Sequence, residues 1–289
     1  MRKNKLFIFL ATLTIIILFS TAAISNQCGI KADEKPSLEK EEKAIVEEGE
    51  DRKEAEEAEA VETSKGEAKE AAEGEEERKE EKVQPSEGEV TFKTEDGVVI
   101  NGNIFGSGNK WVILSHMFPT EQTSWFDFAE YLAENGYIVL TYDFRGYGKS
   151  SGSKDISQIY KDLEAAVNFT GQYDIKKIFL IGASMGGTAS IIVASKEKVD
   201  GLISISAPIE FKGLSAVGEI EKVQCPKLVI ASKGDVSAAQ SADILFEEFS
   251  EPKSIKILDG SAHGTFIFDK DPENGEILKQ LILDFLNSY

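Results

Sequence analysis

Short apolar runs alternate with amphipathic stretches along the C-terminal two thirds of the chain. Runs typical of buried strands lie at 111–115, 137–142, 177–183, 202–206, 227–231 and 255–258. Amphipathic stretches of helical period lie at about 122–135, 156–170, 186–196, 237–249 and 274–287. Two further strand-like runs, at 90–94 and 98–105, flank a turn and predict a hairpin. Because each crossover must cover the sheet, the alternation predicts an α/β fold: a mainly parallel eight-stranded sheet with helices on both faces.

The sequence Gly182-Ala183-Ser184-Met185-Gly186-Gly187 joins one of these strands to the next helix. A serine between small residues at such a turn is typical of a nucleophile elbow, whose strained backbone presents the hydroxyl at a helix N-terminus. The backbone N–H of the next residue and the helix dipole would face a developing oxyanion. We therefore predict Ser184 as a nucleophile and Met185 as an oxyanion donor.

A second match to the same pattern occurs at Gly148-Lys149-Ser150-Ser151-Gly152. This copy lies in a polar stretch, with no strand running directly into it and no helix leaving from Gly152. A hydroxyl there would not be presented at a helix N-terminus. We therefore expect Ser150 not to be a nucleophile.

A serine nucleophile needs a base, and the chain has only two histidines. His116 ends the apolar run at 111–115, upstream of Ser184, whereas His263 lies in a loop just after the run at 255–258. In one class of serine hydrolases the order along the chain is nucleophile, acid, base. That order favours His263 as the general base.

The acid of such a triad is expected between Ser184 and His263, at the end of another strand. Asp235 follows the apolar run at 227–231 and precedes the predicted base by 28 residues. Its task would be to accept the imidazole N–H and stabilise the imidazolium. Asp243 and Asp259 remain alternatives, but the first lies on a predicted helix and the second is close to His263 in sequence.

Residues 90–289 resemble the α/β-hydrolase superfamily, in particular its small serine-esterase and dienelactone-hydrolase-like members. Besides the elbow, the resemblance rests on the segment 143–150, which is similar to the D-x-R-G-x-G-x-S segment after the fourth strand of many such hydrolases. Larger members insert a helical cap where this chain has only 17 residues, between Pro208 and Pro226. We therefore expect an open site with at most a small flap around Ile209 to Val217, suited to acyl groups of modest size.

The resemblance also implies a second oxyanion donor in the loop after the run at 111–115. In the family this loop usually reads His-Gly-x, and the residue after the glycine donates its N–H. The aligned residue here is Phe118. Met117 replaces the glycine, so the loop cannot use a glycine-only conformation and either Met117 or Phe118 would be the donor. His116 would then mainly orient this loop.

The first 30 residues differ in character from the rest. Basic residues precede Leu6 to Ala23, a stretch of 18 residues without charge, and Cys28 follows it. This pattern indicates a secretory signal or an N-terminal membrane anchor, with the remaining chain outside the cytoplasmic membrane. Cys28 is a candidate for lipidation because its position resembles that in bacterial lipoprotein signals. Lipidation, an uncleaved anchor and simple secretion remain open alternatives.

Residues 31–89 form an acidic, low-complexity segment. They hold 24 acidic and 11 basic residues, and so carry net −13 of the chain's −19. With almost no large apolar residues they cannot bury a core, so we interpret them as a spacer between the N-terminus and a catalytic domain at 90–289. That domain is itself acidic, which argues against a nucleic-acid partner.

Together these features predict a serine hydrolase of carboxylesterase type, acting on small-molecule or polymer-end acyl esters through an acyl-enzyme. Two histidines and the lack of a phosphate-cradling or dinucleotide motif argue against a metal or another cofactor. The same residues would serve a peptidase, thioesterase or acyltransferase, because fold and triad do not set the leaving group. A membrane-tethered, non-catalytic binding module on the same scaffold is a further alternative.

Overall fold

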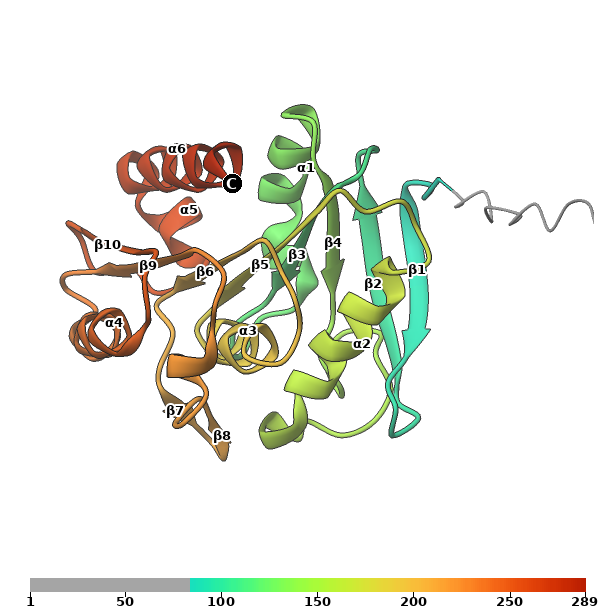
Figure 1. Ribbon diagram of the computed structural model, residues 1–289, viewed down its shortest axis with the longest axis horizontal. Coiled ribbons are helices and arrows are strands. Elements are labelled where there is room, and N and C mark those ends of the chain that lie inside the picture. The colour runs from blue at the N-terminus through green and yellow to red at the C-terminus, as the bar shows by residue number, and fades with distance from the viewer. Residues whose placement is uncertain (1–83) are drawn as a thin grey trace, which may run out of the picture. The chain divides into compact units, whose positions relative to one another are not determined.

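The structure is a computed structural model that describes residues 84–289 (Figure 1). The expected signal or anchor at 1–30, the candidate lipidation site Cys28 and most of the acidic segment at 31–89 lie outside the described residues. No helix within 84–289 is both long and apolar enough to cross a membrane.

The centre of the fold is an eight-stranded sheet with the order β1-β2-β4-β3-β5-β6-β9-β10. The strands are β1 (Gly88–Lys93), β2 (Val99–Phe105), β3 (Lys110–Ser115), β4 (Ile138–Tyr142), β5 (Lys177–Ala183), β6 (Gly201–Ile205), β9 (Lys227–Ser232) and β10 (Lys253–Leu258). β1 and β2 form the predicted antiparallel hairpin, and β2 is antiparallel to β4. All other pairings in this sheet are parallel, so their carboxyl ends meet at one edge.

Helices cover both faces of the sheet. They are α1 (Phe126–Glu134), α2 (Tyr160–Thr170), α3 (Met185–Ala194), α4 (Val236–Glu248), α5 (Phe266–Lys270) and α6 (Pro272–Ser288). Short 3₁₀ turns, η1 (Gln122–Trp125) and η2 (Ile156–Gln158), precede α1 and α2. One core contains side chains from α2, α3 and α4, and a second, on the other face, contains side chains from α1, α5 and α6 (Figure 1). This architecture confirms the predicted α/β class.

The segment between β6 and β9 is short. It contains a two-stranded hairpin, β7 (Glu210–Phe211) and β8 (Leu214–Ser215), followed by the 3₁₀ turn η3 (Ile220–Lys222). The two turn residues, Lys212 and Gly213, have φ of +48° and +87°, as a tight two-residue hairpin turn requires. A small hairpin therefore occupies the place where a flap was expected.

Candidate active site

Ser184 lies at the junction of β5 and α3 with φ +50° and ψ −120°, a conformation that side chains rarely adopt. Its backbone N–H donates to the carbonyl of Ile205 on the neighbouring strand at 2.8 Å. The glycines around it are sterically required. A Cβ at Gly182 would lie 2.2 Å from the carbonyl oxygen of Gly186, and one at Gly186 would lie 2.3 Å from that of Ser115. The elbow is therefore a tight, strained turn that presents Ser184.

The N-terminus of α3 is directed at this serine. The carbonyl of Ser184 accepts from the N–H groups of Gly187 at 2.8 Å and Thr188 at 3.1 Å. The N–H of Met185 has no hydrogen-bond partner among the described residues, as expected at the first position of a helix. This donor and the positive end of the helix dipole are available to an anion beside Ser184.

His263 and Asp235 are paired. The Nδ1 of His263 lies 2.5 Å from Oδ2 of Asp235. The histidine side chain is 37% exposed and the carboxylate 13% exposed. With Nδ1–H donating to the carboxylate, the other ring nitrogen, Nε2, is the one that can accept a proton. The alternatives Asp243 and Asp259 are both exposed, and neither is hydrogen-bonded to His263 in the part of the chain that the structure describes.

The loop that carries His263 lies against the elbow. A Cβ built on Gly264 would lie 3.4 Å from Cβ of Ala183, so the residue after His263 is in van der Waals range of the residue before Ser184. Within residues 84–289 no hydrogen bond joins the Ser184 hydroxyl to His263. Catalytic hydrogen bonds are often long in ligand-free enzymes and tighten only with substrate bound. The structure thus brings the three predicted triad residues to one edge of the sheet.

The loop after β3 forms the other side of the site. Its carbonyl groups at Ser115 and His116 pack against Gly186 of the elbow. Met117 is fully buried, Phe118 is 38% exposed, and Met117 is not among the residues with positive φ. The N–H groups of both Met117 and Phe118 have no hydrogen-bond partner among the described residues. Either N–H is therefore available as the second oxyanion donor.

His116 has a structural position. Its Nε2 accepts from the N–H of Phe144 at 3.0 Å, so Nδ1 carries the proton and donates to the carbonyl of Met117 at 3.0 Å. Burial lowers the pKa of His116 to about 4. A neutral ring with both nitrogens occupied orients the loop and has no free nitrogen to act as a base.

Ser150, in the second copy of the pattern, is held by the backbone. Its hydroxyl donates to the carbonyl of Asp143 at 2.6 Å and accepts from the N–H of Asn101 at 2.9 Å. The residue is buried and has no helix N-terminus beside it. These contacts stabilise the loop after β4 and leave the hydroxyl unsuited to attack.

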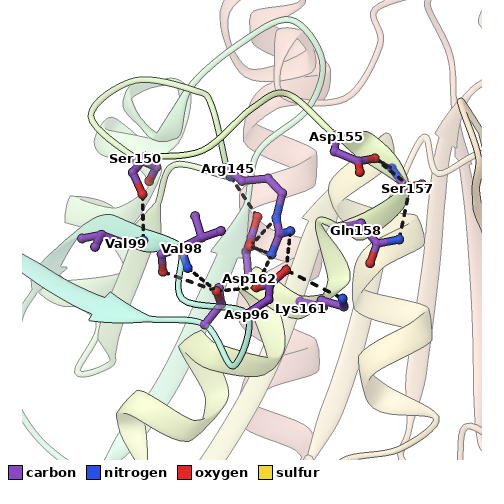
Figure 2. A network of polar contacts seen from close by, with 12 residues as sticks. Asp96, Val98, Val99, Arg145, Ser150, Asp155, Ser157, Gln158, Lys161 and Asp162 are labelled. Atoms are coloured by element: carbon purple, nitrogen blue, oxygen red, sulfur yellow. Dashed lines mark hydrogen bonds and ion pairs between the residues drawn. The ribbon is translucent and has the colours of Figure 1, made fainter. Parts of the chain in front are cut away.

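Arg145 lies in the same loop, at the centre of a polar network (Figure 2). Its guanidinium binds Asp162 of α2 at 2.7 Å and Asp96 of the β1–β2 turn at 2.9 Å. Burial raises the pKa of the Asp162 carboxyl even though Arg145 is bound to it. The hydrogen bond from Arg145 instead holds the pKa of Asp96 well below its usual range. The network fixes the loop whose Phe144 N–H positions His116.

Two residues at the site were not found from the sequence. Ser206 and Ser232, at the ends of β6 and β9, make hydrogen bonds to the residues on either side of His263. Neither serine belongs to a recognisable motif, and only the fold places them beside the loop.

Within residues 84–289 no group of three or more His, Cys, Asp or Glu side chains is arranged to hold a metal ion.

Comparison with known proteins defines the class. A family model described as alpha/beta hydrolase fold matches residues 110–219. The sheet order, the elbow and the flanking helices of residues 84–289 agree with this match and form an α/β-hydrolase fold. An esterase of Pyrococcus furiosus has a similar structure, with a TM-score of 0.62 at 21% identity over 71% of this chain and 91% of that one.

Further relatives are hydrolases or have no stated activity. A monoacylglycerol lipase of Paleococcus ferrophilus gives a TM-score of 0.57 at 21% identity over 65% of this chain and 98% of that one. A 2-hydroxy-6-oxononadienedioate/2-hydroxy-6-oxononatrienedioate hydrolase of Escherichia coli is 32% identical over 142 residues, 42% of this chain and 47% of the relative. The match thus spans about half the length of that relative. An uncharacterized Mycobacterium tuberculosis protein is 26% identical over 71% of this chain and 80% of its own length.

Proposed function

We propose that this protein is a serine hydrolase that cleaves ester-type acyl substrates through an acyl-enzyme. The observation that carries the proposal is the 2.5 Å contact between His263 Nδ1 and Asp235, on a loop that packs against the Ser184 elbow. An imidazole oriented by a carboxylate beside a strained serine is the arrangement that activates a hydroxyl nucleophile.

In this mechanism the Ser184 hydroxyl oxygen bonds to the acyl carbon while Nε2 of His263 takes the hydroxyl proton. Asp235 stabilises the imidazolium through the hydrogen bond to Nδ1. The negative charge on the former carbonyl oxygen is held by the N–H of Met185 and by that of Phe118 or Met117. The intermediate collapses as the leaving alcohol receives the proton from His263. Water, deprotonated by His263, then attacks the acyl carbon. The bond to the Ser184 oxygen breaks as His263 returns the proton to that oxygen, and the acid is released.

The surroundings of the site support acyl groups of modest size. Among the described residues, only the β7–β8 hairpin and one 3₁₀ turn lie between β6 and β9, where a helical cap would be inserted. The ring of Phe211 on this hairpin lies 5.9 Å from that of Phe118, so the hairpin contacts the loop that would supply the second oxyanion donor. An exposed aromatic edge without a helical cap between β6 and β9 suits short acyl chains or the end of a polymer.

The experiment that tests the proposal is active-site labelling with a fluorophosphonate, combined with hydrolysis of p-nitrophenyl esters of graded chain length. The wild-type enzyme should be labelled and should favour short chains, and Ser184→Ala should abolish both labelling and hydrolysis. A non-catalytic binding module would not react at all. Labelling that survives in Ser184→Ala would assign the nucleophile elsewhere.

We further propose that the hydrolase acts outside the cytoplasmic membrane, either anchored to it through the N-terminus or secreted. The support is the sequence alone: basic residues before an uncharged stretch at 6–23, followed by Cys28 and an acidic spacer.

A further inference from the structure

The two neighbours of His263 are each held by a buried serine. The N–H of Gly264 donates to Oγ of Ser206 at 3.1 Å. The hydroxyl of Ser232 donates to the carbonyl of Ala262 at 2.7 Å. Both serines are completely buried. The main chain on each side of the imidazole is therefore fixed to the ends of β6 and β9.

The residue before Ser206 binds the elbow side of the site. The preceding carbonyl, that of Ile205, accepts the N–H of Ser184 at 2.8 Å. The N–H of Ser206 donates to Ile230 of β9 at 2.7 Å. One short segment at the end of β6 thus binds the nucleophile's main chain, the next strand and the His263 loop.

The backbone of Ser206 is strained. Its φ is +52°, one of only three positive values among non-glycine residues in 84–289. Glycine adopts this region without steric penalty, whereas a serine there is disfavoured. Strained conformations cluster at functional sites, where the surrounding structure imposes them. A side chain at this position must therefore make an interaction that glycine cannot make. The hydrogen bond from Gly264 to the Ser206 hydroxyl is such an interaction.

A second serine on the same strand offers a contrast. Ser204 is buried two residues earlier, and its hydroxyl has no hydrogen-bond partner among the described residues. Its backbone is not in the left-handed region. Burial alone therefore does not give a serine hydroxyl at this end of the sheet a hydrogen bond to the site.

We propose that Ser206, together with Ser232, is a positioning residue that fixes the His263 loop relative to the Ser184 elbow. This inference rests on the proposed triad, because it concerns the placement of the general base. Ser206 acts through Gly264 and does not touch the substrate. A small displacement of a catalytic group lowers the rate strongly, so loss of either serine's hydroxyl should lower kcat more than it alters KM.

The test compares Ser206→Gly and Ser206→Ala in the full-length protein. Both variants remove the hydroxyl, but only glycine relieves the strained backbone, so the alanine variant should have the lower Tm. We expect kcat for a p-nitrophenyl ester to fall by a similar factor in both, about 10- to 100-fold, with KM within about twofold. The downfield proton resonance of the His263–Asp235 hydrogen bond should broaden or shift in both variants.

Ser232→Ala should also lower kcat, because it removes the hydrogen bond to Ala262 on the other side of His263. Ser204→Ala is the matched control and should leave kcat and the proton resonance unchanged. If kcat fell only in the variant with the lower Tm, and Ser206→Gly were as active as the wild type, the positioning role would be overturned while the triad assignment stood. A wild-type enzyme that neither hydrolyses esters nor reacts with fluorophosphonate would instead refute the proposed function, and this inference with it.

Discussion

Nδ1 of His263 lies 2.5 Å from Oδ2 of Asp235, although 28 residues separate them in sequence. The two residues follow adjacent parallel strands, Asp235 just after β9 and His263 in the loop after β10. Parallel pairing brings the carboxyl ends of both strands to one edge, and the contact results from this register. The carboxylate thereby selects the imidazole tautomer that can act as a base.

We expect Asp235→Asn to lower kcat by about 10⁴-fold, because an amide in this position favours the wrong tautomer of His263. KM should change much less, since substrate contacts are preserved. Steady-state kinetics on a short-chain ester measure both values. Asp243→Asn, on the exposed face of α4, is the control and should be nearly silent. A large loss from Asp243→Asn with an active Asp235→Asn enzyme would transfer the role of the acid.

Ser150→Ala should affect stability and not chemistry. The substitution leaves the N–H of Asn101 without its acceptor in a buried position, which should lower the free energy of unfolding by about 1–3 kcal/mol. Fluorophosphonate labelling should persist. Ser153→Ala, in the same loop with an exposed side chain, should change the unfolding free energy by less than about 0.5 kcal/mol. Loss of labelling in a folded Ser150→Ala protein would contradict this interpretation.

The two carboxylates around Arg145 should differ in their contributions to stability. Asp162 is fully buried, so Asp162→Asn leaves a buried guanidinium with one charge partner fewer and should destabilise by about 3 kcal/mol. Asp96 is 36% exposed, and Asp96→Asn should have an effect below about 1 kcal/mol. Urea denaturation measures both. Equal effects would show that burial does not control the strength of these two ion pairs.

Acid should destabilise the protein through His116. Its pKa is about 4 in the folded state, against 6.5 for an exposed histidine. Between these values the unfolded chain binds a proton that the folded protein excludes, so the free energy of unfolding falls as the pH decreases from about 6.5 to 4. The full effect of this residue is about 3 kcal/mol.

Thermal unfolding between pH 7 and pH 4 measures this dependence on pH. His116→Asn keeps a donor for the Met117 carbonyl but cannot titrate, so it should be less stable at pH 7 and have a flatter profile. The difference between the two profiles isolates His116 from carboxyl groups such as Asp162, whose raised pKa acts in the opposite sense. Parallel profiles would show that His116 binds its proton with the same pKa in the folded and the unfolded protein, and would contradict the lowered pKa.

The N-terminal sequence predicts an extracytoplasmic protein. Full-length protein expressed in a bacterial host should be recovered with membranes or in the medium, and protease added to intact spheroplasts should reach residues 90–289. Incorporation of labelled fatty acid that Cys28→Ala blocks would identify lipidation as the attachment. Recovery from the cytosol with residues 1–27 still present would contradict the prediction.

The regular parts of the fold could be predicted because their signals are local. The expected runs at 111–115 and 177–183 are β3 and β5 to within one residue, and the hairpin turns at Glu95 to Gly97 as predicted. The expected helical stretch at 274–287 is α6, which begins two residues earlier, and the short helix α5 before it has no counterpart among the predicted stretches. Asp271 caps α6 by accepting the N–H of Asn274, and Pro272 occupies the first turn. Proline favours the first position of a helix and cannot continue the preceding one, so α5 ends at Lys270 and α6 begins at Pro272.

The candidate site was predictable only in part. The elbow, with Ser184, is a contiguous motif, and the order along the chain indicated Asp235 and His263. The contacts of Asp162 with Arg145 and of Ser206 with Gly264 span 17 and 58 residues. Such pairs arise from the packing of α2 and β6 against other elements, and no local pattern encodes them. The positive φ of Ser206 is likewise imposed by its neighbours and contradicts the local preference of a serine.

Met117 lies directly beneath the His263 loop. A Cβ added to Gly264 would lie 2.6 Å from the Met117 sulfur, and that side chain is fully buried and cannot turn away into solvent. The two positions are therefore epistatic. A side chain at 264 avoids the Met117 sulfur only when residue 117 is smaller, and the φ of +57° at Gly264 still disfavours any residue other than glycine. Shortening residue 117 alone leaves a void under the general base. Redesign of the loop after β3 toward a glycine thus has to be coupled to the loop after β10.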